Sequence, residues 1–346
     1  MSSVADSKHQ QLISHTPKHW ATVLVVSLIA LGACILASLA LGSRVVGWTD
    51  LMNGLFHPSI DTYGTSIVEK RIPRTVFCIM CGGALGIAGA LMQSVTRNPI
   101  ADPSILGVNT GAALFVVCGI AFLNISTANE YIWLAMAGAA VTAVFVFGIG
   151  SMGRGGATPI KLILAGAATS AALSSLVSAV MIPRQNVMDK FRFWQVGSVG
   201  AGTWDFTTTL IPFLVVGVVI GILAAPALNA MALGDEAASG LGVRPGVIRL
   251  IAAAAGVILC GAVTALAGPI AFVGLIGTHL VRMLLGPDMR YVIPMSAVAG
   301  ATILMLSDVI GRVVGSPGEL EVGVVTAFIG APILIFLAIR TKVRSL

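Results

Sequence analysis

The sequence predicts an all-α protein that crosses a membrane about ten times. Of its 346 residues, 57% are apolar and only 10% are charged, whereas charged residues make up roughly 25% of a soluble domain. The mean hydropathy is +0.97. Uncharged runs such as residues 21–41 are long enough to cross a hydrocarbon core of about 30 Å as single helices. Composition and run length together indicate a polytopic membrane protein.

The apolar runs divide the chain into its elements. Residues 1–20 are polar and are expected to form a cytoplasmic tail. The run 21–41 is expected to be a first span, because a cleavable signal has a shorter apolar core and a soluble remainder. Residues 250–281 hold no Asp, Glu, Lys or Arg and would be about 48 Å long as one helix, so Gly268-Pro269 is expected to divide them. The ten expected spans are 21–41, 75–93, 104–123, 131–150, 162–182, 206–225, 250–267, 270–285, 291–307 and 322–339. They form one transmembrane domain over 21–340, followed by a tail at 341–346.

An even number of spans places both termini on one side of the membrane. With both termini in the cytoplasm, the inner segments hold twelve Lys and Arg residues and the outer segments eight, in agreement with the positive charge of cytoplasmic loops. This distribution accounts for the net charge of +6 without a nucleic-acid partner. The five cysteines all fall inside expected spans, so no disulfide framework is expected.

Motifs that carry chemistry are mostly absent from the sequence. It holds no Gly-x4-Gly-Lys-[Ser/Thr] phosphate loop, so ATP binding through such a site is not expected. The five histidines do not cluster with carboxylates, and no metal or other cofactor is expected. His279 and Arg282 have the spacing of an intramembrane proton site, but their expected depth near the interface favours a structural role. A transporter is therefore favoured over a membrane enzyme. A secondary transporter or channel that works without ATP or partner proteins is the alternative hypothesis to a transporter with partners.

The segment 226–249 predicts a short amphipathic helix between two spans. Asp235 and Glu236 open a helical pattern in which Ala237, Ala238 and Leu241 share one face. Glycines and Pro245 then end the pattern. This charged, capped helix is either a surface that a soluble partner contacts or a solvated turn, and the pattern alone favours neither.

The eight outer basic residues need an explanation of their own. They are Arg44, Lys70, Arg71, Arg74, Arg184, Lys190, Arg192 and Arg312. Their side chains either reach lipid headgroups or form a basic rim for an acidic protein or an anionic solute. Asp308 lies four residues before Arg312 and is expected to pair with it on one helix face.

Glycine is abundant in the expected spans. The chain holds 40 glycines, and runs such as residues 81–90 allow helix backbones to approach closely. Asn98-Pro99 and Asp102-Pro103 interrupt the region between the second and third spans. An irregular backbone is expected there.

Several ordered motifs resemble one family of bacterial permeases. The first half of the chain holds Arg71-Ile-Pro-Arg74 and the stretch 97–107, Arg-Asn-Pro-Ile-Ala-Asp-Pro-Ser-Ile-Leu-Gly. The second half holds Gly-Pro-Ile-Ala-Phe-Val-Gly-Leu-Ile at 268–276 and Glu-Val-Gly-Val-Val-Thr-Ala-Phe-Ile-Gly-Ala-Pro at 321–332. These motifs resemble the ABC-importer permeases for ferric siderophores, haem and vitamin B12, over nearly the whole chain after residue 20.

The resemblance implies a type II ABC importer permease fold with ten helices in a bacterial plasma membrane. It implies pairing with a second permease subunit, identical or related, with two ATPase subunits that bind ATP, and with an extracytoplasmic solute-binding protein. Alternating access is then driven by the ATPases, which push on the helix near Asp235. The residues that the resemblance assigns are Gly234, Asp235, Glu236, Ala238, Leu241 and Gly242 for ATPase coupling, Arg71, Arg74 and Arg312 for binding-protein docking, and Gly156, Ala157, Thr158 and Pro159 for a cytoplasmic gate.

The cargo is suggested by one outer segment. Residues 193–204 contain Trp194 followed by Gly197-Ser198, which is similar to the iron-siderophore members of this family. Val199 and the sequence of the expected gate depart from the usual pattern. A ferric siderophore is therefore the expected cargo, with haem or cobalamin as the alternative.

Overall fold

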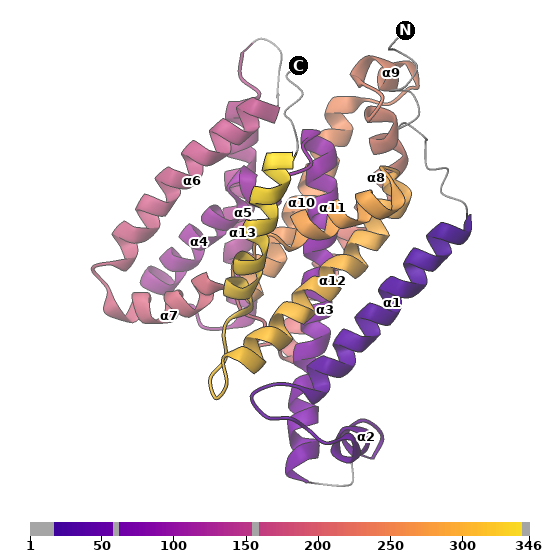
Figure 1. Cartoon of the computed structure of the whole chain (residues 1–346). Coiled ribbons are helices and arrows are strands. Elements are labelled where there is room, and N and C mark those ends of the chain that lie inside the picture. Colours follow the sequence, from indigo (N-terminus) through magenta and orange to yellow (C-terminus); the bar gives the residue numbers. More distant parts are fainter. Residues whose placement is uncertain (1–16, 58–61, 154–158, 341–346) are drawn as a thin grey trace.

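The computed structural model describes residues 17–57, 62–153 and 159–340, and this part of the chain is helical without any strand (Figure 1). Its elements are, in order, α1 (Pro17–Ala40), α2 (Trp48–Phe56), α3 (Tyr63–Thr96), the 3-10 turn η2 (Pro103–Leu106), α4 (Val108–Cys118), the π-helical turn η3 (Gly119–Leu123), α5 (Ala128–Gly150), α6 (Pro159–Met181), α7 (Gln185–Val196), α8 (Trp204–Met231), α9 (Asp235–Gly240), α10 (Pro245–Ala267), α11 (Val273–Leu285), α12 (Met289–Val314) and α13 (Val322–Arg340). The expected all-α membrane fold is confirmed.

Each of the ten expected spans coincides with one helix or with one short series of helices. Within the described residues, seven helices are long and apolar enough to cross a membrane, namely α1, α3, α5, α6, α8, α10 and α12. Three shorter apolar segments, Val108–Leu123, Val273–Leu285 and Val322–Phe336, correspond to the other expected spans. The exact number of ten crossings stays a prediction.

Several boundaries differ from those expected. Helix α3 has 34 residues, Tyr63–Thr96, rather than the expected 75–93, because a capping box at Thr62 starts the helix ahead of the charged segment that contains Pro73. Helix α8 continues through Pro226 to Met231, so the loop expected at 226–249 is reduced to α9 and a few flanking residues. The sequence patterns gave no indication of α2 or α7, whose lengths are 9 and 12 residues.

Helix α3 forms the centre of the bundle and packs against α8, α10, α11 and α12. The close approach that glycine runs predict is present here. A Cβ atom at Gly86 would overlap the backbone of Ser296, and one at Gly82 would overlap the carbonyl of Gly300. Backbone contact of this kind gives α3 and α12 a tightly packed, apolar interface.

The two ends of the bundle carry different small elements. Helix α9 lies at one end, where α1 begins and α13 ends, and α2 and α7 lie at the opposite end (Figure 1). The side chain of His19 at the start of α1 is 2.9 Å from the carbonyl oxygen of Leu284 at the end of α11, which places both at the α9 end. We call these the α9 end and the α2 end.

Candidate functional site

The short helix α9 projects from the bundle between α8 and α10. Its N-cap is Gly234, with φ of 110°, and Gly242 follows it with φ of 82°. These backbone angles favour glycine and set the sharp turns at both ends of the helix. Ala238 is fully buried against the bundle, whereas the side chains of Leu233 and Leu241 are 71% and 66% exposed. The helix expected here is present, but Ala237 and Leu241 are exposed while Ala238 is buried, so the three residues do not share one face as expected.

Asp235 is the residue that fastens α9 to the rest of the structure. Arg249 of α10 donates to both carboxylate oxygens, at 2.8 and 2.9 Å. Arg97, the C-cap of α3, has a left-handed backbone conformation. It forms an ion pair with the same carboxylate and donates to the carbonyl oxygen of Met231 at 2.7 Å. The Asp235 carboxylate of α9 is therefore joined to α10 through Arg249 and to α3 through Arg97, and Arg97 also contacts the end of α8.

This environment changes the acidity of Asp235. Partial burial raises the pKa of the carboxyl, but the hydrogen bonds and charges of Arg249 and Arg97 outweigh burial, so that the pKa lies below its ordinary value. Asp235 is therefore ionised at neutral pH, which keeps both arginines bound.

At the α2 end, the structure brings together the three arginines that the sequence singled out. Arg312 is 2% exposed and forms an ion pair with Asp308 at 2.9 Å, so the expected pair is confirmed. Its guanidinium also donates to the carbonyl and hydroxyl oxygens of Ser38 in α1, at 3.0 and 2.9 Å. Arg71 is 9% exposed and donates to the carbonyl oxygens of Leu39 and Arg44, at 2.8 and 2.7 Å.

Arg74 has a different environment from the other two arginines. Its guanidinium lies 2.7 Å from Asp308, which is buried, and 2.7 Å from Glu319, whose side chain is 40% exposed. We call Arg71, Arg74, Asp308, Arg312 and Glu319 the outer cluster. It holds three arginines and two carboxylates and therefore carries one net positive charge. The side chain of Arg74 is itself only 14% exposed, but it is the arginine of this cluster that pairs with the partly exposed Glu319.

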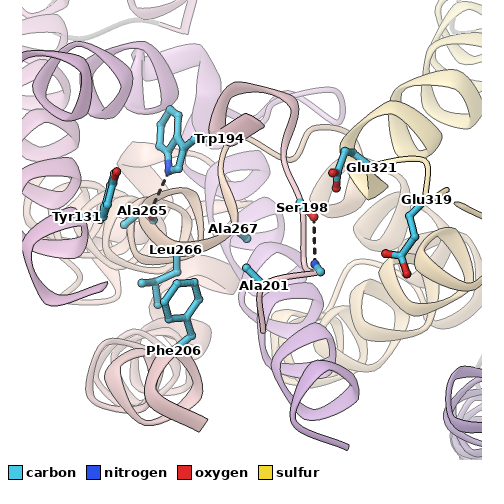
Figure 2. Close-up of a pocket in the computed structure, with 11 residues that line it drawn as sticks. Tyr131, Trp194, Ser198, Ala201, Phe206, Ala265, Leu266, Ala267, Glu319 and Glu321 are labelled. Carbon is cyan, nitrogen blue, oxygen red and sulfur yellow. Dashed lines mark hydrogen bonds between the residues drawn. The ribbon is translucent and has the colours of Figure 1, made fainter. Parts of the chain in front are cut away.

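A cavity of about 460 Å³ lies beside the outer cluster (Figure 2). Its size is within the range of small-molecule sites, roughly 300–1,000 Å³. Aromatic side chains line one part of it, and the carboxylates of Glu319 and Glu321 line the opposite part. Trp194, from the outer segment that the sequence connected with cargo, is fixed there by a hydrogen bond of 3.0 Å from its indole nitrogen to Ala265. Glu319 thus belongs both to the cavity and to the outer cluster.

Comparison with known proteins identifies the family of this chain. The sequence pattern of the FecCD transport family matches residues 28–340. The chain belongs to the FecCD transport family. It is therefore a transport permease, and its apolar helices fit a multi-pass protein of the inner membrane.

Relatives of this FecCD permease cover most of its length. The ferric enterobactin transport system permease protein FepD of Escherichia coli (strain K12) is 45% identical over 282 residues, which is 81% of this chain and 84% of the relative. The hemin transport system permease protein HmuU of Yersinia pestis is 30% identical over 327 residues, 92% of this chain and 94% of the relative. A solved metal-chelate type ABC transporter in an inward-facing conformation superimposes with a TM-score of 0.80 at 25% identity, and the match covers 93% of this chain and 99% of that one.

The structure describes some of the expected site residues and not others. Of the expected gate residues, Gly156, Ala157 and Thr158 lie outside the described residues, and Pro159 begins α6. The sequence reasoning missed Glu319 and Arg97 as members of sites. The conspicuous acidic residues near Pro317 were a signal for Glu319, but no local pattern reveals that Arg97 lies beside Asp235, which is 138 positions away.

Proposed function

We propose that this chain is the permease subunit of an ABC importer that carries a ferric siderophore across the bacterial plasma membrane. The observation that supports this most strongly is the 45% identity to the ferric enterobactin permease over 282 residues. The permease works by alternating access and pairs with a second permease subunit, identical or related. Two partner ATPase subunits and an extracytoplasmic binding protein complete the transporter. Both termini lie in the cytoplasm.

The α9 end is the proposed ATPase contact. Exposed leucines that flank a small projecting helix on both sides favour contact with a partner protein, because apolar side chains of this size gain free energy when they are buried together. Leu241 and Leu233 supply such a surface, and Gly234, Glu236, Ala238 and Gly242 shape it. Closure of the ATPase dimer then pushes on α9, and Asp235 passes the force to the bundle.

The outer cluster is the proposed contact for an acidic surface of the binding protein. Arg74 is best placed to meet a partner carboxylate, because its present surface partner, Glu319, is itself partly exposed. Arg71 and Arg312 are occupied by α1 and Asp308. They contribute positive charge to the face and hold its shape, while Arg74 makes the direct contact. The gate remains proposed at residues 156–159.

Haem is a second candidate cargo, because the hemin permease relative matches 92% of this chain; cobalamin would require the same mechanism. The test is uptake into proteoliposomes that hold the complete transporter, with an ATPase variant lacking its phosphate-loop lysine as the control. Uptake of a ferric siderophore that needs both ATP hydrolysis and the binding protein supports the proposal. Uptake of haem but not of a ferric siderophore would identify haem as the cargo. Uptake in the ATPase control would overturn the importer mechanism in favour of secondary transport.

A further inference from the structure

The ion pair between Arg97 and Asp235 joins α9 to the inner end of the central helix of the bundle. Arg97 is the C-cap of α3, and its Nη2 atom donates to Met231 at the end of α8 while it pairs with Asp235 at the start of α9. Asp235 is held independently by Arg249 of α10. The contact of α9 with α3 can therefore be removed while its contact with α10 stays.

The same helix carries an outer-cluster residue at its other end. Arg74 and Arg97 are separated by 23 residues of α3, about 35 Å at the rise of an α-helix. The segment between them is largely buried and packs backbone to backbone against α11 and α12. A helix packed in this way moves as a rigid body, since its interface has no free space that could absorb a displacement at one end.

The ion pair is poorly placed to serve stability. The side chains of Arg97 and Asp235 are 41% and 44% exposed, and pairs with this exposure contribute little to folding. Two arginines converging on one exposed carboxylate from different helices instead give α9 a defined position relative to both helices.

We propose that Arg97 and Asp235 form a mechanical joint through which α3 connects the ATPase contact at α9 with the binding-protein contact at the outer cluster. Both are positioning residues, and the inference rests on the proposed function. Because coupling between two sites is reciprocal, the joint acts in both directions. Binding protein at the outer cluster changes the position of α9, and ATPase closure at α9 changes the outer cluster.

The test is binding-protein-stimulated ATP hydrolysis by the complete transporter in nanodiscs, with wild-type permease, Arg97→Gln, Asp235→Asn and the double variant. Arg97→Gln should co-purify with its ATPases, and the ratio of its stimulated to its own basal hydrolysis rate should fall about fivefold relative to that ratio in the wild type. The double variant should lose no more stimulation than Asp235→Asn alone. Arg290→Gln removes the same charge from an exposed position at the α9 end and should keep wild-type stimulation.

Arg249→Gln separates transmission from simple loosening of α9. Arg249→Gln likewise removes one positive charge from beside the Asp235 carboxylate, but it leaves the contact between α9 and α3 in place. It should therefore reduce stimulation less than Arg97→Gln does. Equal losses in the two variants, or wild-type stimulation in Arg97→Gln, overturn the joint while leaving the importer intact. If Arg97→Gln fails to assemble, the milder variants Arg97→Lys and Arg249→Lys, each of which alters one of the two ion pairs of Asp235, are compared by the same criterion. A wild-type transporter with neither stimulation nor ATP-dependent uptake overturns the proposed function and the joint together.

Discussion

Asp308 is expected to contribute far more to stability than Glu319, although each carboxylate lies 2.7 Å from a guanidinium nitrogen of Arg74. The side chain of Asp308 is 3% exposed and that of Glu319 is 40% exposed. Asp308 also neutralises Arg312, whose side chain is 2% exposed. Asp308→Asn therefore leaves a buried guanidinium without its counter-ion, whereas Glu319→Gln leaves Arg74 paired with Asp308.

The expected sizes of the two effects follow from burial. Removing one partner of a buried ion pair costs about 3–5 kcal/mol, because the remaining charge stays buried and unpaired. The lower end, about 3 kcal/mol, applies to Asp308→Asn because Arg312 keeps its hydrogen bonds to Ser38. Glu319→Gln should cost less than about 1 kcal/mol, since solvent screens its ion pair. At about 2 °C per kcal/mol for a long chain, the melting temperature should fall by about 6 °C in Asp308→Asn and by less than about 2 °C in Glu319→Gln.

The cysteines of this chain provide the assay. Cys78, Cys81 and Cys260 are buried and free, so a thiol-reactive dye reports their exposure as the purified permease unfolds on heating in detergent. Both variants are measured beside the wild type under identical conditions. Equal shifts for the two variants would refute the reasoning, because the two carboxylates lie at equal distances from Arg74 and differ in their burial and in the second, buried partner Arg312 of Asp308.

The remaining predictions concern docking, packing and pH. Arg74→Gln should weaken binding of the solute-binding protein to the transporter in nanodiscs about tenfold, while Glu319→Gln should strengthen it by freeing Arg74; the same affinity in both variants would contradict the docking assignment. Gly86→Ala should cost about 1–3 kcal/mol in the dye assay because it overpacks α3 against α12, whereas Gly148→Ala, with no neighbouring atom within 4 Å, should be neutral or stabilise by up to about 1 kcal/mol. The depressed pKa of Asp235 means that its ion pairs stabilise α9 above about pH 4 and are lost as the pH falls through the folded-state pKa. In the wild type, hydrogen exchange of the α9 amides should therefore accelerate, relative to the intrinsic exchange rate, when the pH falls below the folded-state pKa. The Asp235→Asn variant should show no such acceleration.

The sequence predicted the helices well because the membrane imposes a strong local rule. A span needs about 20 apolar residues, and this rule located ten helical segments in the right order. It failed where helices leave the apolar layer. The first turns of α3 carry Lys70, Arg71 and Arg74, so their charge hid a helix that the Thr62 cap begins. Helices α2 and α7 lack an apolar run of the length that the rule detects.

The candidate sites were predictable as locations but not as contacts. Motif resemblance singled out Arg71, Arg74 and Arg312, yet it gave no sign that Arg71 and Arg312 bind the end of α1. From the sequence alone, Arg71 and Arg74 would both be expected to tolerate replacement by Glu without harm to folding. The structure limits that experiment to Arg74, because an acidic side chain at Arg71 would face the carbonyl oxygens of Leu39 and Arg44 and destabilise the fold.

The packing of α3 explains why the outer cluster is expected to respond as a unit. Gly82 and Gly86 bring the backbone of α3 against that of α12, and contacts between backbones cannot be compressed or rearranged as flexible side chains can. Helix α12 carries Asp308 and Arg312, and α3 carries Arg74. A displacement that reaches α3 through Arg97 must therefore move α12 as well. The movement changes the position of the whole cluster rather than the rotamer of one arginine, so its effect should appear in binding-protein affinity even when every ion pair in the cluster stays intact.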